Sequence, residues 1–347
     1  MIKHLVLTEP EIQDIRVLLE TLTKAFATPE DPRFIHDAVL YAHDLPFRVR
    51  QGINDFRLSE SDGETICLIS GYPIDDQKIG PTPPNREVKN DTPRTLEEQM
   101  LLVLCAALLG ESFGWFTQQM GFLVNDILPV KGHEYQQVGS SSEEPLTWHT
   151  EEAFHPYRCD YLGLMCLRNP NQGATMVAST EVVSGLSEDQ IRILFEPRFT
   201  IRPDEIHFEN HRPTLPAHLN GAQAQQLLQR AYDTINQMNT NPTPMAVLFG
   251  DPASPYMCMD SLYLEGLDEE ADRVVKAFIR AIDEQLTDLV LQAGEICFID
   301  NYRTVHGRRA FKANYDGTDR WLKRLNITRD LRKSRSMRLT TTSRFIF

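Results

Sequence analysis

The chain has 347 residues, of which 41% are hydrophobic and 24% are charged, a composition typical of a globular protein. Its length fits one large domain or two small ones. The formal net charge of −14 disfavours a nucleic-acid partner bound through its phosphates and mildly favours a cationic ligand.

The N-terminal third of the chain predicts helices around one buried strand. Apolar residues recur at helical spacing, and Thr95 followed by Glu97 and Glu98 is a typical helix start. A stretch rich in Asp, Gly, Pro and Asn between positions 75 and 91 predicts a loop. The helices are expected at residues 9–26, 33–43 and 95–110, and the strand at residues 65–73.

Beyond Trp115 the pattern changes to short segments separated by Gly, Pro and Asn, which is typical of an all-β sandwich or barrel. Residues 203–241 are polar, with only partial helical periodicity, and we interpret them as an insertion that is either a lid over a site or a surface decoration. Strands are expected at 161–167, 173–178, 295–300 and 321–328, and helices at 187–195 and 268–292.

These elements predict a single domain spanning residues 1–347. Its parts are a helical segment at about 1–113, a β-rich core at about 114–330 that contains the insertion, and a basic tail at 331–347. The six cysteines show no C-x-x-C pair and lie mostly among apolar neighbours, as buried free thiols do.

The apolar stretches are too short for a signal peptide or a membrane span. The longest run, residues 100–109, is about half of the roughly 20 residues that cross a bilayer. We therefore expect a cytoplasmic protein without a membrane partner, and its oligomeric state stays open, a homo-oligomer included.

The segment Trp148–Pro156 contains two candidate metal ligands. In an extended strand His149 and Glu151 project from the same face, so an imidazole and a carboxylate can converge on one ion. Trp, Thr and Phe followed by a proline fit a strand that runs into a loop better than a helix. A His-x-Glu triplet also arises by chance, and the alternative is a surface histidine beside a solvated acid.

A third candidate, His306, follows an expected strand and turn. Arg320 comes fourteen residues later and Arg324 four residues after that. This even separation places both guanidinium groups on one face of a strand, about 13 Å apart at roughly 3.3 Å per residue. Buried arginines that face inward are costly unless anions bind them. The alternative interpretation is that both arginines lie on a solvated basic strand edge.

Together these motifs resemble the iron(II) and 2-oxoglutarate-dependent oxygenases of the clavaminate synthase-like group, and more narrowly the bacterial hydroxylases of free L-lysine and L-arginine. The resemblance covers about residues 100–330, and its segments are 114–119, 148–170 and 300–308. It implies an α+β fold with a mainly β core, a double-stranded β-helix (a cupin-like jelly roll) flanked by α-helices.

The resemblance implies that His149, Glu151 and His306 bind Fe(2+) as a facial triad, with three positions left for the co-substrates 2-oxoglutarate and O2. Arg320 would bind the distal carboxylate of 2-oxoglutarate, because its planar fork is bidentate. Thr175, in a Gly-Ala-Thr strand, would add a hydroxyl there, although an ordinary strand threonine is the alternative.

For the amino-acid substrate, the resemblance places Arg324 at the α-carboxylate, Gln118 near the α-amino group, Glu151 facing the substrate and Asp260 at the cationic end. Asp260 could instead be a turn-forming residue.

Arginine hydroxylases tend to have a second acid where this chain has Leu262. One acid beside an apolar neighbour suits an ammonium better than a guanidinium. We therefore expect hydroxylation of L-lysine at C3 or C4, coupled to conversion of 2-oxoglutarate to succinate and CO2, with L-arginine or L-ornithine as alternatives.

Two other classes of protein are alternatives. A zinc hydrolase could use the same two histidines and glutamate with a bound water, but it has no need of a dianion anchor such as Arg320 with Thr175. A binding jelly roll without chemistry would not need an intact triad. Four further histidines are not expected to bind iron, although the first could support the site; they are His155, His207, His211 and His218.

Overall fold

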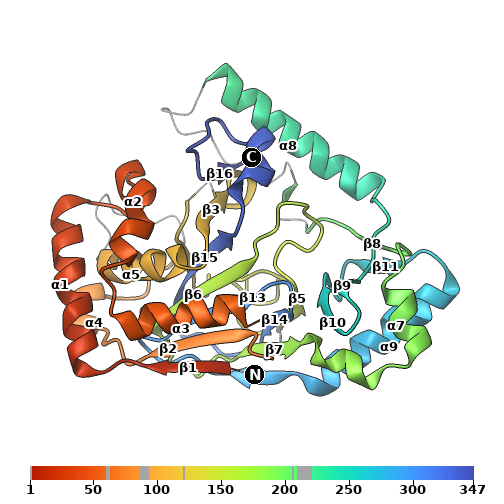
Figure 1. The fold of residues 1–347 in the computed structure, drawn as a ribbon, viewed down its shortest axis with the longest axis horizontal. Helices are drawn as coiled ribbons and strands as arrows, with labels where there is room; N and C mark the ends of the chain where they lie inside the picture. The colour runs from red at the N-terminus through yellow and green to blue at the C-terminus, as the bar shows by residue number, and fades with distance from the viewer. Residues whose placement is uncertain (1, 60–62, 86–93, 120–121, 205–206, 209–220) are drawn as a thin grey trace.

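The computed structural model describes residues 2–59, 63–85, 94–119, 122–204, 207–208 and 221–347. The N-terminal part, drawn in red to orange in Figure 1, contains three of the predicted helices and the predicted strand. Its elements are β1 (Ile2–Val6), α1 (Glu9–Ala25), α2 (Pro32–Ala42), α3 (Phe47–Leu58), β2 (Ile66–Ser70), α4 (Asp76–Ile79) and α5 (Leu96–Ala107). Strand β1 and helix α3 were not predicted.

The rest of the chain alternates short strands with a few helices. The first elements are β3 (Glu111–Trp115), α6 (Phe116–Gln119), β4 (Asn125–Ile127), β5 (Leu146–His149), β6 (Tyr161–Arg168), β7 (Thr175–Ser179), the 3-10 helix η1 (Thr180–Gly185), α7 (Glu188–Leu194) and β8 (Phe199–Ile201). The remaining elements are α8 (Ala222–Thr240), β9 (Leu248–Asp251), β10 (Ser254–Met257), β11 (Leu264–Gly266), α9 (Glu269–Gln285), β12 (Thr287–Leu289), β13 (Ile296–Asp300), β14 (Thr304–Arg308), β15 (Trp321–Thr328), the 3-10 helix η5 (Leu331–Met337) and β16 (Phe345–Ile346).

Two sheets form the β core. The larger sheet has the order β1-β2-β13-β6-β15-β3-β16, with β4 also paired to β15, and the smaller sheet has the order β12-β7-β14-β5. Leu162, Leu164 and Leu322 from the larger sheet form one buried cluster with Val177 from the smaller sheet. The sheets therefore pack face to face, as the predicted jelly roll requires.

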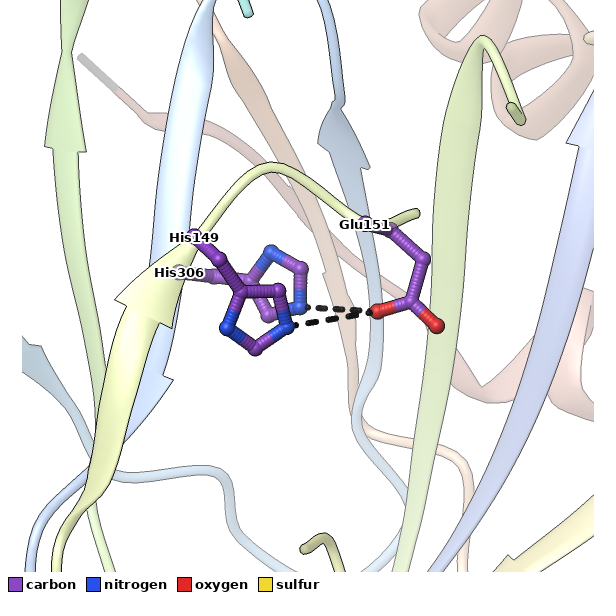
Figure 2. A group of neighbouring side chains, drawn as sticks. All are labelled: His149, Glu151 and His306. Carbon is purple, nitrogen blue, oxygen red and sulfur yellow. Dashed lines mark ion pairs between the residues drawn. The ribbon is translucent and has the colours of Figure 1, made fainter. Parts of the chain in front are cut away.

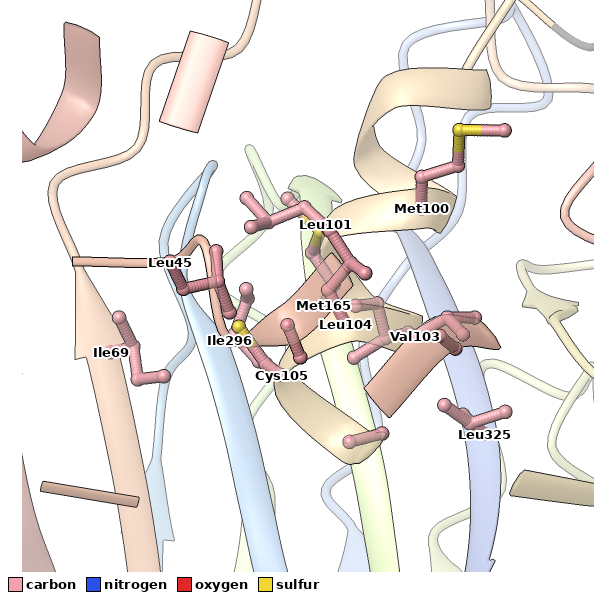
Figure 3. Close-up of a cluster of buried hydrophobic side chains, with 14 of the residues drawn as sticks. Leu45, Ile69, Met100, Leu101, Val103, Leu104, Cys105, Met165, Ile296 and Leu325 are labelled. Carbon is pink, nitrogen blue, oxygen red and sulfur yellow. The ribbon is translucent and has the colours of Figure 1, made fainter. Parts of the chain in front are cut away.

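Helices cover the outer face of the larger sheet. Helix α5 lies directly on that face, and its apolar side chains are buried on nearly every side. Figure 3 shows Leu101 and Leu104 of α5 beside Met165 of β6 and Ile296 of β13. Full burial of one such side chain contributes roughly 1.5–3 kcal/mol. This helical layer holds the strands of the larger sheet in place from the outer face of that sheet.

Helices α7 and α9 cover the outer face of the smaller sheet, at the right of Figure 1. Trp148 of β5 and Val305 of β14 pack there with Phe278 of α9, and Trp148 Nε1 donates to Asp283 Oδ1 at 2.7 Å. The two strands that bear the candidate histidines are thus held from outside by one helix.

The predicted helix at 268–292 is too long. It ends at Gln285, because Leu286 adopts an extended backbone and residues Thr287–Leu289 form β12, which pairs antiparallel with β7. Local periodicity could not reveal this strand, since its partner lies about 110 residues earlier in the chain.

Helix α8 occupies much of the predicted insertion. It buries Ala224, Ala231, Tyr232 and Ile235 along one face, so the partial periodicity did reflect a helix. His211 and His218 lie outside the described residues, as does most of the segment that precedes α8. The basic tail packs onto the fold, because β16 pairs with β3 and the ring of Phe347 stacks on that of Phe116.

No helix in the described part of the chain is both long and apolar enough to cross a membrane.

Candidate functional site

The candidate ligands meet at the ends of neighbouring strands. His149 is the last residue of β5 and lies directly opposite His306 of β14 in the antiparallel register. The ligand atoms of His149, Glu151 and His306 all lie within 4.8 Å of one another. Figure 2 shows both imidazoles turned toward the Glu151 carboxylate, with Glu151 Oε2 3.7 Å from His149 Nε2 and 3.3 Å from His306 Nε2.

The prediction that Glu151 lies on the same strand as His149 is wrong. Strand β5 ends at His149, and Glu151 lies in the following turn, where Glu152 adopts a positive φ of 53°. Asn301 holds this turn, since its Oδ1 accepts from the Glu151 amide at 2.7 Å and its Nδ2 donates to the Glu151 carbonyl at 3.0 Å. The turn, and not strand alternation, brings the carboxylate to the histidines.

This donor set fits a divalent metal ion. His149 Nδ1 lies 2.8 Å from the Thr147 carbonyl, and donation there leaves a lone pair on Nε2. Such a hydrogen bond is the usual way in which a metal-bound histidine is oriented. Two imidazole nitrogens and a carboxylate that converge in a buried site suit the two-histidine, one-carboxylate geometry of non-haem iron.

The electrostatics of Glu151 and His306 agree with a site for a cation, whereas the neighbouring carboxylates of Glu151 and Asp260 outweigh burial and raise the pKa of His149 to about 9, so an ion must displace a proton there. Burial would raise the pKa of Glu151, but the charge of Arg324 and hydrogen bonds from the two histidines hold this pKa well below its usual range. Burial lowers the pKa of His306. An ionised carboxylate and a neutral imidazole are the protonation states that metal binding needs.

Arg320 and Thr175 lie in the same pocket as the three candidate ligands. Arg320 is 4% exposed, its Nε donates to the Gly173 carbonyl at 3.2 Å, and its Nη2 reaches Thr175 Oγ1 at 3.5 Å. No carboxylate among the described residues forms an ion pair with it. A buried guanidinium with only neutral partners is suited to bind an anionic ligand.

Replacement of Gly173 by alanine is expected to weaken this anion site. A Cβ at Gly173 would lie 2.8 Å from Arg320 Cδ and 3.3 Å from a ring carbon of Phe311, so the guanidinium must move. We expect the 2-oxoglutarate concentration for half-maximal succinate formation to rise about tenfold or more. The matched control is Gly185→Ala, where nothing lies within 4 Å of the added carbon; equal behaviour of the two variants would contradict the prediction.

Arg324 and Gln118 form a hydrogen-bonded group with Glu151. Arg324 Nη1 donates to Glu151 Oε1 at 2.6 Å, and its Nη2 donates to Gln118 Oε1 at 2.9 Å. Arg320 and Arg324 line the same pocket. Arg320 lies just before β15, and the pairing of β15 with β6 shifts register between Trp321 and Leu322, so the predicted strand alternation alone does not place both arginines there. Their assignment to co-substrate and substrate stays a prediction.

Sequence reasoning missed Glu152 and His207. Gln118 Nε2 donates to Glu152 Oε1 at 2.8 Å, which fixes the Gln118 amide with its oxygen toward Arg324. The other Glu152 oxygen lies 2.6 Å from His207 Nε2, and both side chains are almost fully buried. Contacts between positions this far apart in the sequence have no local signature.

Removal of the His207 imidazole is expected to destabilise the fold in a pH-dependent way. Burial lowers the pKa of His207, but the Glu152 carboxylate outweighs it and the net shift is upward. The pair therefore stabilises the fold fully below the unfolded pKa near 6.5, and this contribution is lost as pH rises through the higher folded pKa.

We expect His207→Gln to lower the free energy of unfolding by roughly 3–5 kcal/mol at low pH, because the substitution leaves the Glu152 charge buried without its partner. The loss should be smaller at alkaline pH. Thermal unfolding of wild type and variant across this pH range measures the difference. His36→Gln, at an exposed histidine paired with Asp37, is the control. The ion pair would be refuted if the difference in unfolding free energy between wild type and variant did not change with pH.

Two further carboxylates, Asp204 and Asp260, line the pocket. Asp260 forms a β-bridge with His149, and its Oδ1 accepts from the amides of Leu262 and Tyr263. Asp204 lines the same pocket from the segment after β8, and sequence reasoning did not find it. Leu262 also lines the pocket and is 50% exposed.

His155 is a structural histidine of the aromatic wall beside the site. Its ring packs edge-on against that of Trp115, with 4.3 Å between the ring centroids, and its Nδ1 accepts from the Tyr157 amide at 3.0 Å. Burial lowers the pKa of His155 to about 3, so it stays neutral. It supports the turn that follows Glu151, in line with our expectation.

Comparison with known proteins agrees with this site. Residues 102–326 match the model of the "Taurine catabolism dioxygenase TauD, TfdA family". The chain is 41% identical to an enduracididine beta-hydroxylase of Streptomyces hygroscopicus, over 98% of both chains. It is also 41% identical to an L-ornithine/L-arginine 3-hydroxylase of Catenulispora acidiphila, over 99% of both. An L-lysine 3-hydroxylase of that organism is 29% identical, over 96% of this chain and 86% of the relative.

A solved structure of the non-haem iron oxygenase OrfP with Fe, succinate and (3S)-hydroxy-L-Arg superposes with a TM-score of 0.91, at 39% identity and over 99% of both chains. Another OrfP structure contains Fe and α-ketoglutaric acid. The predicted jelly-roll fold and the predicted cofactors, iron and 2-oxoglutarate, are thereby confirmed, and the zinc-hydrolase alternative is excluded. The chain belongs to the TauD, TfdA dioxygenase family and is an iron- and 2-oxoglutarate-dependent non-haem oxygenase.

Proposed function

We propose that this enzyme hydroxylates C3 of free L-arginine or a closely related guanidino amino acid, while 2-oxoglutarate and O2 are converted to succinate and CO2. The observation on which the substrate depends is the pair of carboxylates, Asp204 and Asp260, that line the pocket of the candidate metal site. A planar guanidinium offers several donors in a fixed fork and can meet two carboxylates at once.

In this proposal His149, Glu151 and His306 hold the iron, and Arg320 with Thr175 binds the distal carboxylate of 2-oxoglutarate. The bound iron supplies the activation of O2 for attack on an unactivated C–H bond. The protein contributes placement and the exclusion of water, since Glu151, His306, Thr175 and Arg320 are each less than a tenth exposed.

The α-end of the amino acid is assigned to Arg324, Gln118 and Glu151. Arg324 bridges Glu151 and Gln118, and an incoming α-carboxylate offers this guanidinium a second anionic partner. Gln118 and Glu151 then lie beside the α-amino group, for which both present oxygen acceptors. Binding at both ends would hold C3 at a fixed place relative to the metal.

The lysine preference that we drew from Leu262 is not confirmed. It counted a single acid, Asp260, at the cationic end, whereas a second acid, Asp204, also lines the pocket. The two relatives at 41% identity act, by name, on enduracididine and on ornithine or arginine, and the lysine hydroxylase is more distant. These relationships support the arginine or ornithine alternative.

The test is a substrate panel. Succinate and the hydroxylated amino acid are measured with iron(II), ascorbate and 2-oxoglutarate for the common L-amino acids plus ornithine. We expect the highest kcat/KM with arginine, and expect Asp204→Asn and Asp260→Asn each to lower it by about tenfold or more. Preference for lysine over arginine would refute the guanidine assignment, and no stimulation by any amino acid would refute the substrate class.

We also propose that residues 1–347 act as a single domain in the cytoplasm. All proposed site residues line one pocket, and all six cysteines are buried and free, as expected for a reducing compartment.

A further inference from the structure

Arg308 is a buried cation of the active-site pocket that has no role in the proposed chemistry. It is the last residue of β14, two positions after His306. Its side chain lines the same pocket as Arg320 and the candidate ligands, and the residue is 4% exposed, like Arg320.

The partners of Arg308 are all neutral. Its Nη1 donates to the Ser142 carbonyl at 3.0 Å, and its Nη2 donates to Ser141 Oγ at 2.7 Å and to the Glu144 carbonyl at 2.8 Å. Its Nε is buried without a hydrogen-bond partner. Within the described ranges no acidic side chain forms an ion pair with it, so its positive charge is uncompensated.

Two other buried cations of this protein have acidic partners. Arg303 pairs with Asp300 at 2.8 Å, and Lys323 pairs with Asp126 at 2.5 Å. Buried Arg338 resembles Arg308 instead, because it donates to backbone carbonyls. Unlike Arg338, however, Arg308 lines the pocket of the candidate metal site.

Arg308 and Arg320 are close neighbours. The two guanidinium groups lie 5.2 and 6.0 Å from the centre of the same ring, that of Phe311. Burial lowers the pKa of Arg320 to about 10, and burial together with the charge of Arg320 lowers the pKa of Arg308 to about 10. Two buried like charges without a counter-ion are costly, and an anion that binds between or beside them removes this cost.

We propose that Arg308 is a second cationic residue of the co-substrate subsite, where its uncompensated charge makes the pocket select a dicarboxylate over a monocarboxylate 2-oxo acid. Arg320 supplies the direct contact with the distal carboxylate, and Arg308 supplies an additional positive potential. The neutral oxygens of residues 141–144 hold its guanidinium in place without cancelling its charge. This inference rests on the proposed use of 2-oxoglutarate.

The test compares binding of 2-oxoglutarate with binding of 2-oxopentanoate, which has the same chain length and lacks the distal carboxylate. Calorimetry with Mn(II) in place of iron measures both affinities without turnover. The variants are Arg308→Met and Arg308→Gln, which lose the charge, and Arg308→Lys, which keeps it. The matched control is Arg309→Met, at the adjacent arginine, whose exposed side chain pairs with Asp288.

We expect Arg308→Met and Arg308→Gln to weaken 2-oxoglutarate binding by about tenfold or more, as loss of a unit charge in a poorly hydrated pocket implies, and to change 2-oxopentanoate binding by less than about twofold. Arg308→Lys should stay within about threefold of wild type for both ligands, and Arg309→Met should match wild type. Circular dichroism checks the fold of each variant, and either neutral variant suffices for the comparison.

Two results would overturn the inference. The first is equal weakening for the two ligands in the neutral variants, which would assign Arg308 only to anchoring residues 141–144. The second is a loss in Arg308→Lys as large as in Arg308→Met, because the charge is then not what matters. If wild-type protein with Mn(II) fails to bind 2-oxoglutarate at all, the proposed function fails instead, and this outcome is distinct from both.

Discussion

Replacement of His306 by alanine is expected to abolish turnover and iron binding together. His306 contributes one of three candidate ligand atoms that lie within 4.8 Å of one another, and among the described residues the group contains no histidine besides His149 and His306. Loss of an outer partner of a metal ligand already costs about 10–100-fold in affinity or activity, so loss of a ligand should cost more than about 100-fold. His149→Ala should behave in the same way.

Two measurements check this expectation: the iron bound per chain after anaerobic loading, and succinate formed with and without amino acid. His36→Ala is the control, because that histidine is exposed on α2 and pairs with its neighbour Asp37. A His306→Ala variant that keeps one iron per chain and hydroxylates its substrate would remove His306 from the ligand set.

Replacement of Arg320 by lysine is expected chiefly to raise the 2-oxoglutarate requirement. The side chain is buried with only neutral partners, so the co-substrate carboxylate would be its one anionic contact. A lysine keeps the charge and loses the planar fork, and we expect the concentration for half-maximal turnover to rise about tenfold or more. Arg320→Met, which also loses the charge, should cost more, since removal of one partner of a buried charge pair costs about 2–5 kcal/mol.

The rate at saturating 2-oxoglutarate separates binding from chemistry. If Arg320 only binds the co-substrate, that rate should fall far less in Arg320→Lys than the apparent affinity does. Arg309→Lys, at an exposed arginine, should change neither the rate at saturating 2-oxoglutarate nor the apparent affinity for it. Normal co-substrate affinity in Arg320→Lys would remove the residue from its assigned role.

The sequence predicts the candidate ligands well because each lies in or beside a strand with a short, recognisable pattern. His149 and His306 end up opposite each other in one antiparallel pair, an arrangement that their order in the chain permits but does not require. The position of Glu151 in a turn was not predictable, because the turn depends on Asn301, about 150 residues away.

Helix α3 shows why part of the fold escaped sequence reasoning. Gly52 lies in its middle, and glycine there disfavours a helix by about 1 kcal/mol relative to alanine. In the fold, an added Cβ at Gly52 would lie 2.5 Å from a methyl carbon of Leu5 on β1. Glycine thus permits the close packing of α3 on β1, and neither element is evident without the other. Glu152 and Arg308 were missed for the same reason, since their partners are distant in sequence.

Strand β15 has a consequence for the position of hydroxylation. Arg320 immediately precedes β15 and Arg324 lies within it, and both line one pocket. If they bind the keto acid and the amino acid as proposed, their separation does not depend on which side chain is bound. Amino acids of different length then present the same carbon, counted from the α-carbon, to the reactive centre, and differ only in how they meet the loops at the far end. Side-chain selectivity can change through residues such as Asp204 and Leu262 while the site of oxygen insertion stays the same.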